Sequence, residues 1–261
     1  MSTAFRTSNP VFSSKSFGGF VTADARGQVR TAAEPRVMTV QGTVDRTAIL
    51  LGILVLTAIV PWRIAFGGGD PAALVPLLGL GLVGGFVLAL VTVFKQSWAK
   101  VTAPLYAACE GLVLGGVSAI YEARYQGIVL QAVGLTLGVL AVLLVAYKTR
   151  TIRATERFRT GVIAATGAIA LMYLLSWILG MFGVNIGFIH STGWLGIGIS
   201  LVIVGVAALN LILDFDLIEQ GAKQGAPKYM EWYGGFGVLV TLVWLYLEIL
   251  RLLSLLNRRR D

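Results

Sequence analysis

Residues 195–217, LGIGISLVIVGVAALNLILDFDL, decide the fold class of this protein. The stretch has no charged side chain before Asp214. A helix needs about 20 predominantly apolar residues to cross the ~30 Å hydrocarbon core of a bilayer. The stretch is therefore long and apolar enough for a membrane span, and two acids, Asp214 and Asp216, lie near its end.

Six more stretches of this kind occur between residues 47 and 256. They are 47–66, 72–94, 102–121, 128–147, 161–183 and 236–256. A membrane β-barrel would need alternating segments of about ten residues, which are absent from this sequence. The sequence predicts an all-α polytopic membrane protein whose seven transmembrane helices form one domain over residues 41–257.

The composition of the chain excludes several kinds of fold and functional site. Of the 261 residues, 56% are hydrophobic and 13% charged, against about 25% charged in a soluble domain. One cysteine, Cys109, and one histidine, His190, cannot supply a Cys/His metal cluster or a disulfide framework. The basic residues lie between apolar runs and are not clustered with aromatic residues, so no nucleic-acid partner is expected. No cofactor and no enzymatic activity are expected either.

The distribution of Lys and Arg predicts the orientation. Of the 21 basic residues, 15 fall on the side of the N-terminus and 6 on the other side. Cytoplasmic loops are enriched in Lys and Arg, so the N-terminus is predicted to be cytoplasmic. Residues 1–40 are polar and lack the apolar core of a signal peptide, which favours a disordered cytoplasmic tail. An odd number of spans places the basic tail, 258–261, outside; the alternative is a last segment that re-enters.

Small residues repeat at helical spacing in three of the predicted spans. The pairs are Gly81 with Gly85, Gly111 with Gly115, and Gly134 with Gly138. Such pairs let helix backbones approach closely within a membrane. The sequence predicts packing surfaces at these positions.

Acids inside the spans are the candidate functional residues, because a carboxylate in hydrocarbon is costly and faces the bundle interior or a water-filled cavity. Glu110 lies in the third span and Glu248 in the seventh. Asp214 and Asp216 are about 200° apart around the sixth helix, so they face different neighbours. Glu248 and Arg251 are three residues apart, a spacing at which a structural salt bridge can form.

Asp214 and Glu248 could act together. If they approach each other in a low-dielectric interior, both cannot ionise cheaply and they share a proton. Loss of that proton leaves two negative charges that attract a hard cation such as Ca²⁺, which would bind there transiently. The predicted boundaries place the two acids about 10 Å apart in depth; a seventh span that begins near Thr241 would close most of this gap.

Three of these stretches resemble the Bax-inhibitor family, the transmembrane Bax-inhibitor-motif proteins. They are Leu213–Ile218 (LDFDLI), Leu245–Leu253 (LYLEILRLL) and Glu110–Gly115 (EGLVLG). The segment Ser8–Phe12 (SNPVF) is similar to the actinobacterial branch.

The resemblance implies six helices around a central last helix, and a pH-sensitive cation leak, with Ca²⁺ as the permeant ion, in a bacterial cytoplasmic membrane. The family's paired acids would fall on Asp214 and Glu248. Two positions depart from the family: Glu248 replaces an Asp, and Arg251 replaces an Asn. Some bacterial relatives have an Arg at the end of the second span that holds the acid pair as a latch. This chain has Lys95 at that position, and its ammonium group lacks the bidentate fork of a guanidinium.

Two hypotheses for function remain open. The first is a leak channel in which Asp214 and Glu248 sense pH. Four further residues would assist them: Glu110, Asp216, Arg251 and Lys95. The partners of this channel are the lipid bilayer, Ca²⁺ and protons. The second is a non-transporting regulator that binds a membrane protease or another membrane protein through the polar N-terminal tail.

Overall fold

A computed structural model describes residues 37–68, 70–152, 154–183 and 193–258. The part of the chain from Met38 on forms one compact unit. Residues 1–36, including most of the predicted tail, as well as His190 and Arg259–Asp261, lie outside the described residues.

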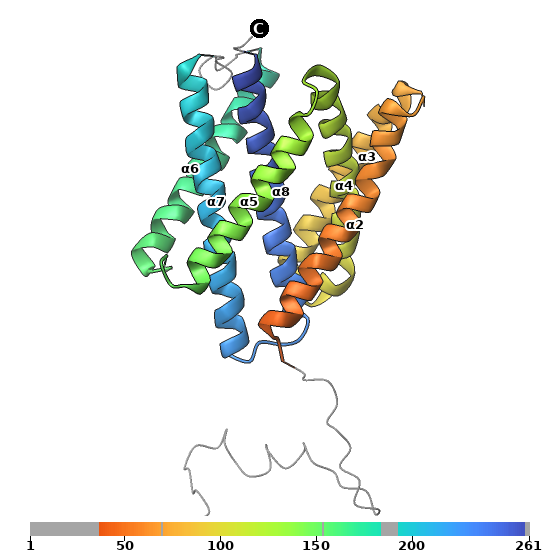
Figure 1. Ribbon diagram of the computed structural model, residues 1–261. Coiled ribbons are helices and arrows are strands. Elements are labelled where there is room, and N and C mark those ends of the chain that lie inside the picture. The colour runs from red at the N-terminus through yellow and green to blue at the C-terminus, as the bar shows by residue number, and fades with distance from the viewer. Residues whose placement is uncertain (1–36, 69, 153, 184–192, 259–261) are drawn as a thin grey trace, which may run out of the picture. The chain divides into compact units, whose positions relative to one another are not determined.

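Seven long helices make up this unit, and all seven are long and apolar enough to cross a membrane (Figure 1). They are α2 (Val40–Phe66), α3 (Leu74–Phe94), α4 (Ala99–Arg124), α5 (Ile128–Lys148), α6 (Glu156–Met181), α7 (Trp194–Lys223) and α8 (Met230–Asn257). The described residues contain no strand. The prediction of an all-α, seven-span membrane protein is confirmed.

Helix ends differ from the predicted spans mainly at the starts of α2, α6 and α8 and at the end of α7, which continues six residues beyond its predicted span. The helix α2 begins at Val40, seven residues before the predicted span, because the Thr39 side chain accepts a hydrogen bond from Gly42 N at 2.9 Å and caps the helix. The helix α8 begins at Met230, six residues before its predicted span. Apolar runs mark the part of a helix that fits the hydrocarbon, whereas capping groups mark its ends.

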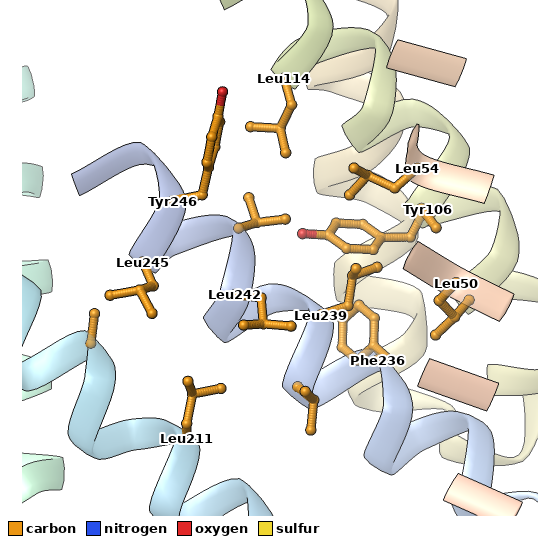
Figure 2. Close-up of a cluster of buried hydrophobic side chains, with 14 of the residues drawn as sticks. Leu50, Leu54, Tyr106, Leu114, Leu211, Phe236, Leu239, Leu242, Leu245 and Tyr246 are labelled. Atoms are coloured by element: carbon orange, nitrogen blue, oxygen red, sulfur yellow. The ribbon is translucent and has the colours of Figure 1, made fainter. Parts of the chain in front are cut away.

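The last helix is the centre of the unit, and this expectation too is confirmed. Most residues in the apolar part of α8 are buried, whereas few in α3 and α6 are. Figure 2 shows Leu239 and Leu242 of α8 with Leu211 of α7 on one side and Tyr106 of α4 on the other. The ring of Tyr106 packs edge-on against Phe236, with 5.0 Å between the ring centroids.

Two of the three predicted glycine pairs are packing surfaces. A Cβ at Gly111 would meet Leu54 O of α2, and one at Gly115 would meet Ala58 O. A Cβ at Gly81 of α3 would meet Cys109 O of α4, whereas one at Gly85 would make ordinary contacts with the Glu110 and Cys109 side chains. By contrast, a Cβ at Gly134 or Gly138 would meet no atom of the described residues within 4 Å, so among these residues the prediction of a packing surface on α5 is wrong. The spacing of small residues does not show which helix faces have a neighbour.

The antiparallel arrangement gives the unit two ends (Figure 1). At the Lys223 end, α2 and α8 begin and α7 finishes; Met38 N there donates a hydrogen bond to Ala226 O at 2.7 Å. At the Arg258 end, α6 and α8 finish.

Candidate functional site

Glu248 is a buried acid in the central helix, with 6% of its surface exposed. Its Oε1 accepts a hydrogen bond of 2.6 Å from the Tyr173 hydroxyl of α6. Its Oε2 is buried without a hydrogen-bond partner and lies 3.7 Å from Arg251 Nη1. The salt bridge expected from the spacing of Glu248 and Arg251 is therefore present, although at long range.

Tyr173 links the acid to the guanidinium. Arg251 Nη1 donates to the Tyr173 oxygen at 2.6 Å, while the same hydroxyl donates to Glu248. The three side chains form a continuous network between α6 and α8, called the Tyr173 network below. Sequence reasoning missed Tyr173. The available signal was a tyrosine hydroxyl well inside an apolar span, where it needs a polar partner.

A cavity of about 730 Å³ opens beside this network toward the Arg258 end. Its polar lining residues are Tyr121, Tyr173, Ser176, Arg251, Ser254 and Arg258. Glu248 is not among the residues that line the cavity. Tyr173 and Arg251 therefore lie at the border between the cavity and the buried carboxylate of Glu248.

Asp214 lies at a different depth. A Cβ on Gly237 would be 3.8 Å from Asp214 Oδ1, and Thr241 is a second α8 neighbour of this carboxyl. The other oxygen, Oδ2, is buried and has no hydrogen-bond partner. Asp214 thus faces α8 near the Lys223 end with one carboxylate oxygen unsatisfied.

The two acids are not brought together. Glu248 is seven residues beyond Thr241, or about 10 Å along the helix axis, and none of the hydrogen bonds found among the described residues joins it to Asp214. The expectation of a directly shared proton, which depended on contact between the two carboxyls, is therefore corrected. A seventh span that begins near Thr241 would leave this separation unchanged, because Gly237 and Thr241 remain the α8 residues beside Asp214.

Asp216 points to a different neighbour from Asp214. Its Oδ2 accepts hydrogen bonds from Arg159 Nη2 of α6 at 2.8 Å and from Gln220 at 2.6 Å. The Arg159–Asp216 ion pair ties the start of α6 to α7 at the Lys223 end. Asp216 therefore has a structural partner that the sequence did not predict.

The remaining candidates lie apart from the Tyr173 network. Glu110 is half-buried on α4 beside Tyr106, and it faces Gly85 of α3. Lys95 is exposed at the end of α3, with its Nζ 4.4 Å from the centre of the Trp98 ring. No ion pair of Lys95 with an acid is found among the described residues, so the structure does not show it as a latch.

A further buried acid, Glu231, lies in the first turn of α8 and was not predicted as a site. Its Oε1 accepts hydrogen bonds from Thr39 N at 3.1 Å and Thr39 Oγ1 at 2.9 Å. Gly42 leaves room for this carboxyl, since a Cβ there would clash with it. Glu231 therefore anchors the start of α2 to the start of α8.

Six apolar helices around a central seventh, with acids buried between them, define a polytopic membrane protein. A family model described as Bax inhibitor 1 like matches residues 9–258, which is nearly the whole chain. The chain therefore belongs to the Bax inhibitor 1 like family. A search of curated protein sequences finds no match.

Proposed function

We propose that this protein is a pH-sensitive cation leak in its membrane, with Ca²⁺ as the permeant ion. The observation that supports this most is Glu248, an acid buried in the central helix with one carboxylate oxygen unsatisfied and a guanidinium 3.7 Å away. A charge at this depth is costly to keep and marks ion or proton pathways in membrane proteins.

The Tyr173 network would hold the path closed. Arg251 places a positive charge between Glu248 and the cavity, which repels a cation that enters from the Arg258 end. Protonation of Glu248 removes the negative charge that attracts Arg251, so the guanidinium is held less firmly. Cation flux should therefore rise as the pH falls.

Asp214 would provide a second acidic position on the path. Its unsatisfied oxygen faces α8 near the Lys223 end. Hard cations such as Ca²⁺ prefer carboxylate oxygens. In this proposal the two acids act in sequence at two depths about 10 Å apart along the path, and do not share one proton.

The test is Ca²⁺ flux into proteoliposomes loaded with a Ca²⁺ indicator, from about pH 5 to about pH 8. Glu248→Gln keeps the shape of the side chain without its charge, so it should leak at neutral pH and lose most of the pH dependence. Glu156→Gln is the matched control, because the Glu156 side chain is 89% exposed. It should behave like the wild type.

Two results would contradict the proposal. One is a Glu248→Gln variant with the pH profile of the wild type. The other is a wild type that passes no Ca²⁺ at any pH, which would replace the leak with the non-transporting regulator as the better hypothesis.

A further inference from the structure

The helix α6 packs mainly against α7, and its apolar segment has the smallest buried share of the seven spans (Figure 1). Among its described residues only Val162 is buried, whereas α8 is buried over most of its length. Helices in a membrane are held together by close packing and by hydrogen bonds between them. Since packing holds α6 less firmly than α8, its side-chain bonds carry more of the attachment.

Side-chain bonds join α6 to its neighbours at three depths. They are Arg159 with Asp216 of α7, Thr166 with Asn210 of α7, and Tyr173 with Glu248 of α8. The three donor–acceptor distances are 2.8, 2.7 and 2.6 Å. The three α6 residues are spaced seven positions apart, which is about two helical turns or 10 Å, so they lie on one face of the helix.

Open spaces lie on two sides of the second half of α6. On the α8 side is the cavity of about 730 Å³ that Tyr173 lines. On the α7 side, Ile169 and Met172 of α6 and residues of α7 between Trp194 and Ile203 line an apolar groove of about 620 Å³. Close-packed interiors transmit strain, whereas a helix bordered by open space can shift without overlapping its neighbours. The part of α6 beyond Thr166 has such space on both sides.

The bond at Tyr173 depends on the charge of Glu248. A hydrogen bond to an ionised carboxylate is roughly twice as strong as one between neutral groups, so protonation of Glu248 weakens the hold of Tyr173. Arg251 is the charged group that faces the same carboxylate. Neither α7 from 194 to 213 nor α5 from 128 to 146 has a charged or titratable side chain. In the half of the bundle toward the Arg258 end, the other helices packed on α8, and α8 itself, contribute Tyr121, Glu122 and Arg124 of α4, Arg63 of α2, and Tyr246 and Arg258 of α8.

We infer that protonation of Glu248 releases the second half of α6, from Thr166 on, which then moves away from α7 and α8. The Arg159–Asp216 ion pair and the buried Val162 hold the first turns of α6 in place. This movement rests on the proposed function, because it is the step that opens the cation path beside Tyr173. In this mechanism α6 is the moving helix and the central α8 stays in place.

A reversible cross-link tests whether α6 has to move. In the full-length Cys109→Ala protein, Thr166→Cys and Asn210→Cys are joined by a short bifunctional methanethiosulfonate, which a thiol reductant removes. In proteoliposomes the linked protein should lose most of its Ca²⁺ flux at about pH 5, and the reductant should restore it. Thr92→Cys with Thr102→Cys is the matched control, since these two hydroxyls are also 2.7 Å apart and join α3 to α4. The linked control should keep its flux.

Spin labels measure the movement without any ion flux. With labels at Leu171→Cys of α6 and Leu82→Cys of α3, both exposed, the distance should be longer at about pH 5 than at about pH 8. Glu248→Gln lacks the charge at every pH, so it should show the longer distance already at about pH 8. Labels at Val142→Cys of α5 and Leu82→Cys should keep one distance at both pH values.

Three outcomes decide between the possibilities. An unchanged α6 distance, or undiminished flux after α6 is linked to α7, would overturn the inference. Equal loss of flux in the two linked pairs would show a general need for flexibility, and this too would overturn it. A wild type that passes no Ca²⁺ but whose α6 distance lengthens at low pH would contradict the proposed leak and support the movement.

Discussion

The hydroxyl of Tyr173 contacts two charged side chains that lack a short direct hydrogen bond to each other. Glu248 Oε2 and Arg251 Nη1 are 3.7 Å apart, whereas Tyr173 is 2.6 Å from each of its two partners. Hydrogen bonds to charged groups contribute about 1.5–3 kcal/mol each, more than bonds between neutral groups. The hydroxyl therefore determines how firmly Arg251 is held beside Glu248.

Replacing Tyr173 with Phe tests this role. The ring remains and both hydrogen bonds are lost, so we expect higher Ca²⁺ flux at neutral pH and a flatter pH profile, with a loss of stability of about 2 kcal/mol. Tyr147→Phe is the matched control, because the Tyr147 hydroxyl bonds an acid, Glu219, at the other end of the bundle. Equal changes in the pH profile of the two variants would show that Tyr173 has only a structural role.

For single residues, the sequence indicates which charged side chains are functional candidates better than it indicates which residues they contact. Glu248, Arg251 and Asp214 stand out because charges are rare within apolar runs. Tyr173 and Glu231 do not, since a tyrosine in a span and an acid in the first turn of a helix are both ordinary. Their roles follow from contacts between residues 75 and 192 positions apart, which no local pattern encodes.

Packing between elements depends on which glycine faces meet a neighbour. The helix α4 approaches α2 closely because Gly111 and Gly115 have no Cβ to meet Leu54 O and Ala58 O. On α5, Gly134 has open space around it. The same sequence pattern therefore has different consequences on the two helices.

Gly111→Ala should lower the free energy of unfolding by about 1–3 kcal/mol, because the added methyl group would collide with the α2 backbone. Gly134→Ala should be neutral or slightly stabilising, since alanine favours the helix and meets no neighbour. Unfolding of both variants in mixed micelles measures the difference. A Gly111→Ala variant as stable as Gly134→Ala would contradict the packing described for α2 and α4.

For the whole molecule, the number of spans and the central position of α8 could be foreseen, the first from hydropathy and the second from a family resemblance. The separation of Asp214 and Glu248 could be foreseen only in part. Helix rise predicts a difference in depth of about 10 Å, but the start of α8 depends on contacts at Met230 and Glu231. The partners that the two acids have instead, Tyr173 for Glu248 and Thr241 for Asp214, are not indicated by the sequence.

Seven spans place the Lys223 end and the Arg258 end on opposite sides of the membrane, and the Lys and Arg distribution predicts that the Lys223 end is cytoplasmic. In a Cys109→Ala background, a membrane-impermeant thiol reagent added to intact cells should label Arg258→Cys and leave Glu156→Cys unlabelled. Lysis should make both reactive. Labelling of Glu156→Cys in intact cells, with Arg258→Cys protected, would reverse the orientation; labelling of both would exclude seven full spans.

In the proposed mechanism, buried acids at two depths control a cation path. The most direct measurement is the pH profile of Ca²⁺ flux in proteoliposomes for the Asp214→Asn, Glu248→Gln double variant beside the wild type and each single variant. In the wild type we expect Ca²⁺ flux that rises as the pH falls. Glu248→Gln should give a flat and raised profile, and Asp214→Asn should give reduced flux. The double variant should show no proton-dependent flux. A double variant with the wild-type profile would contradict the claim.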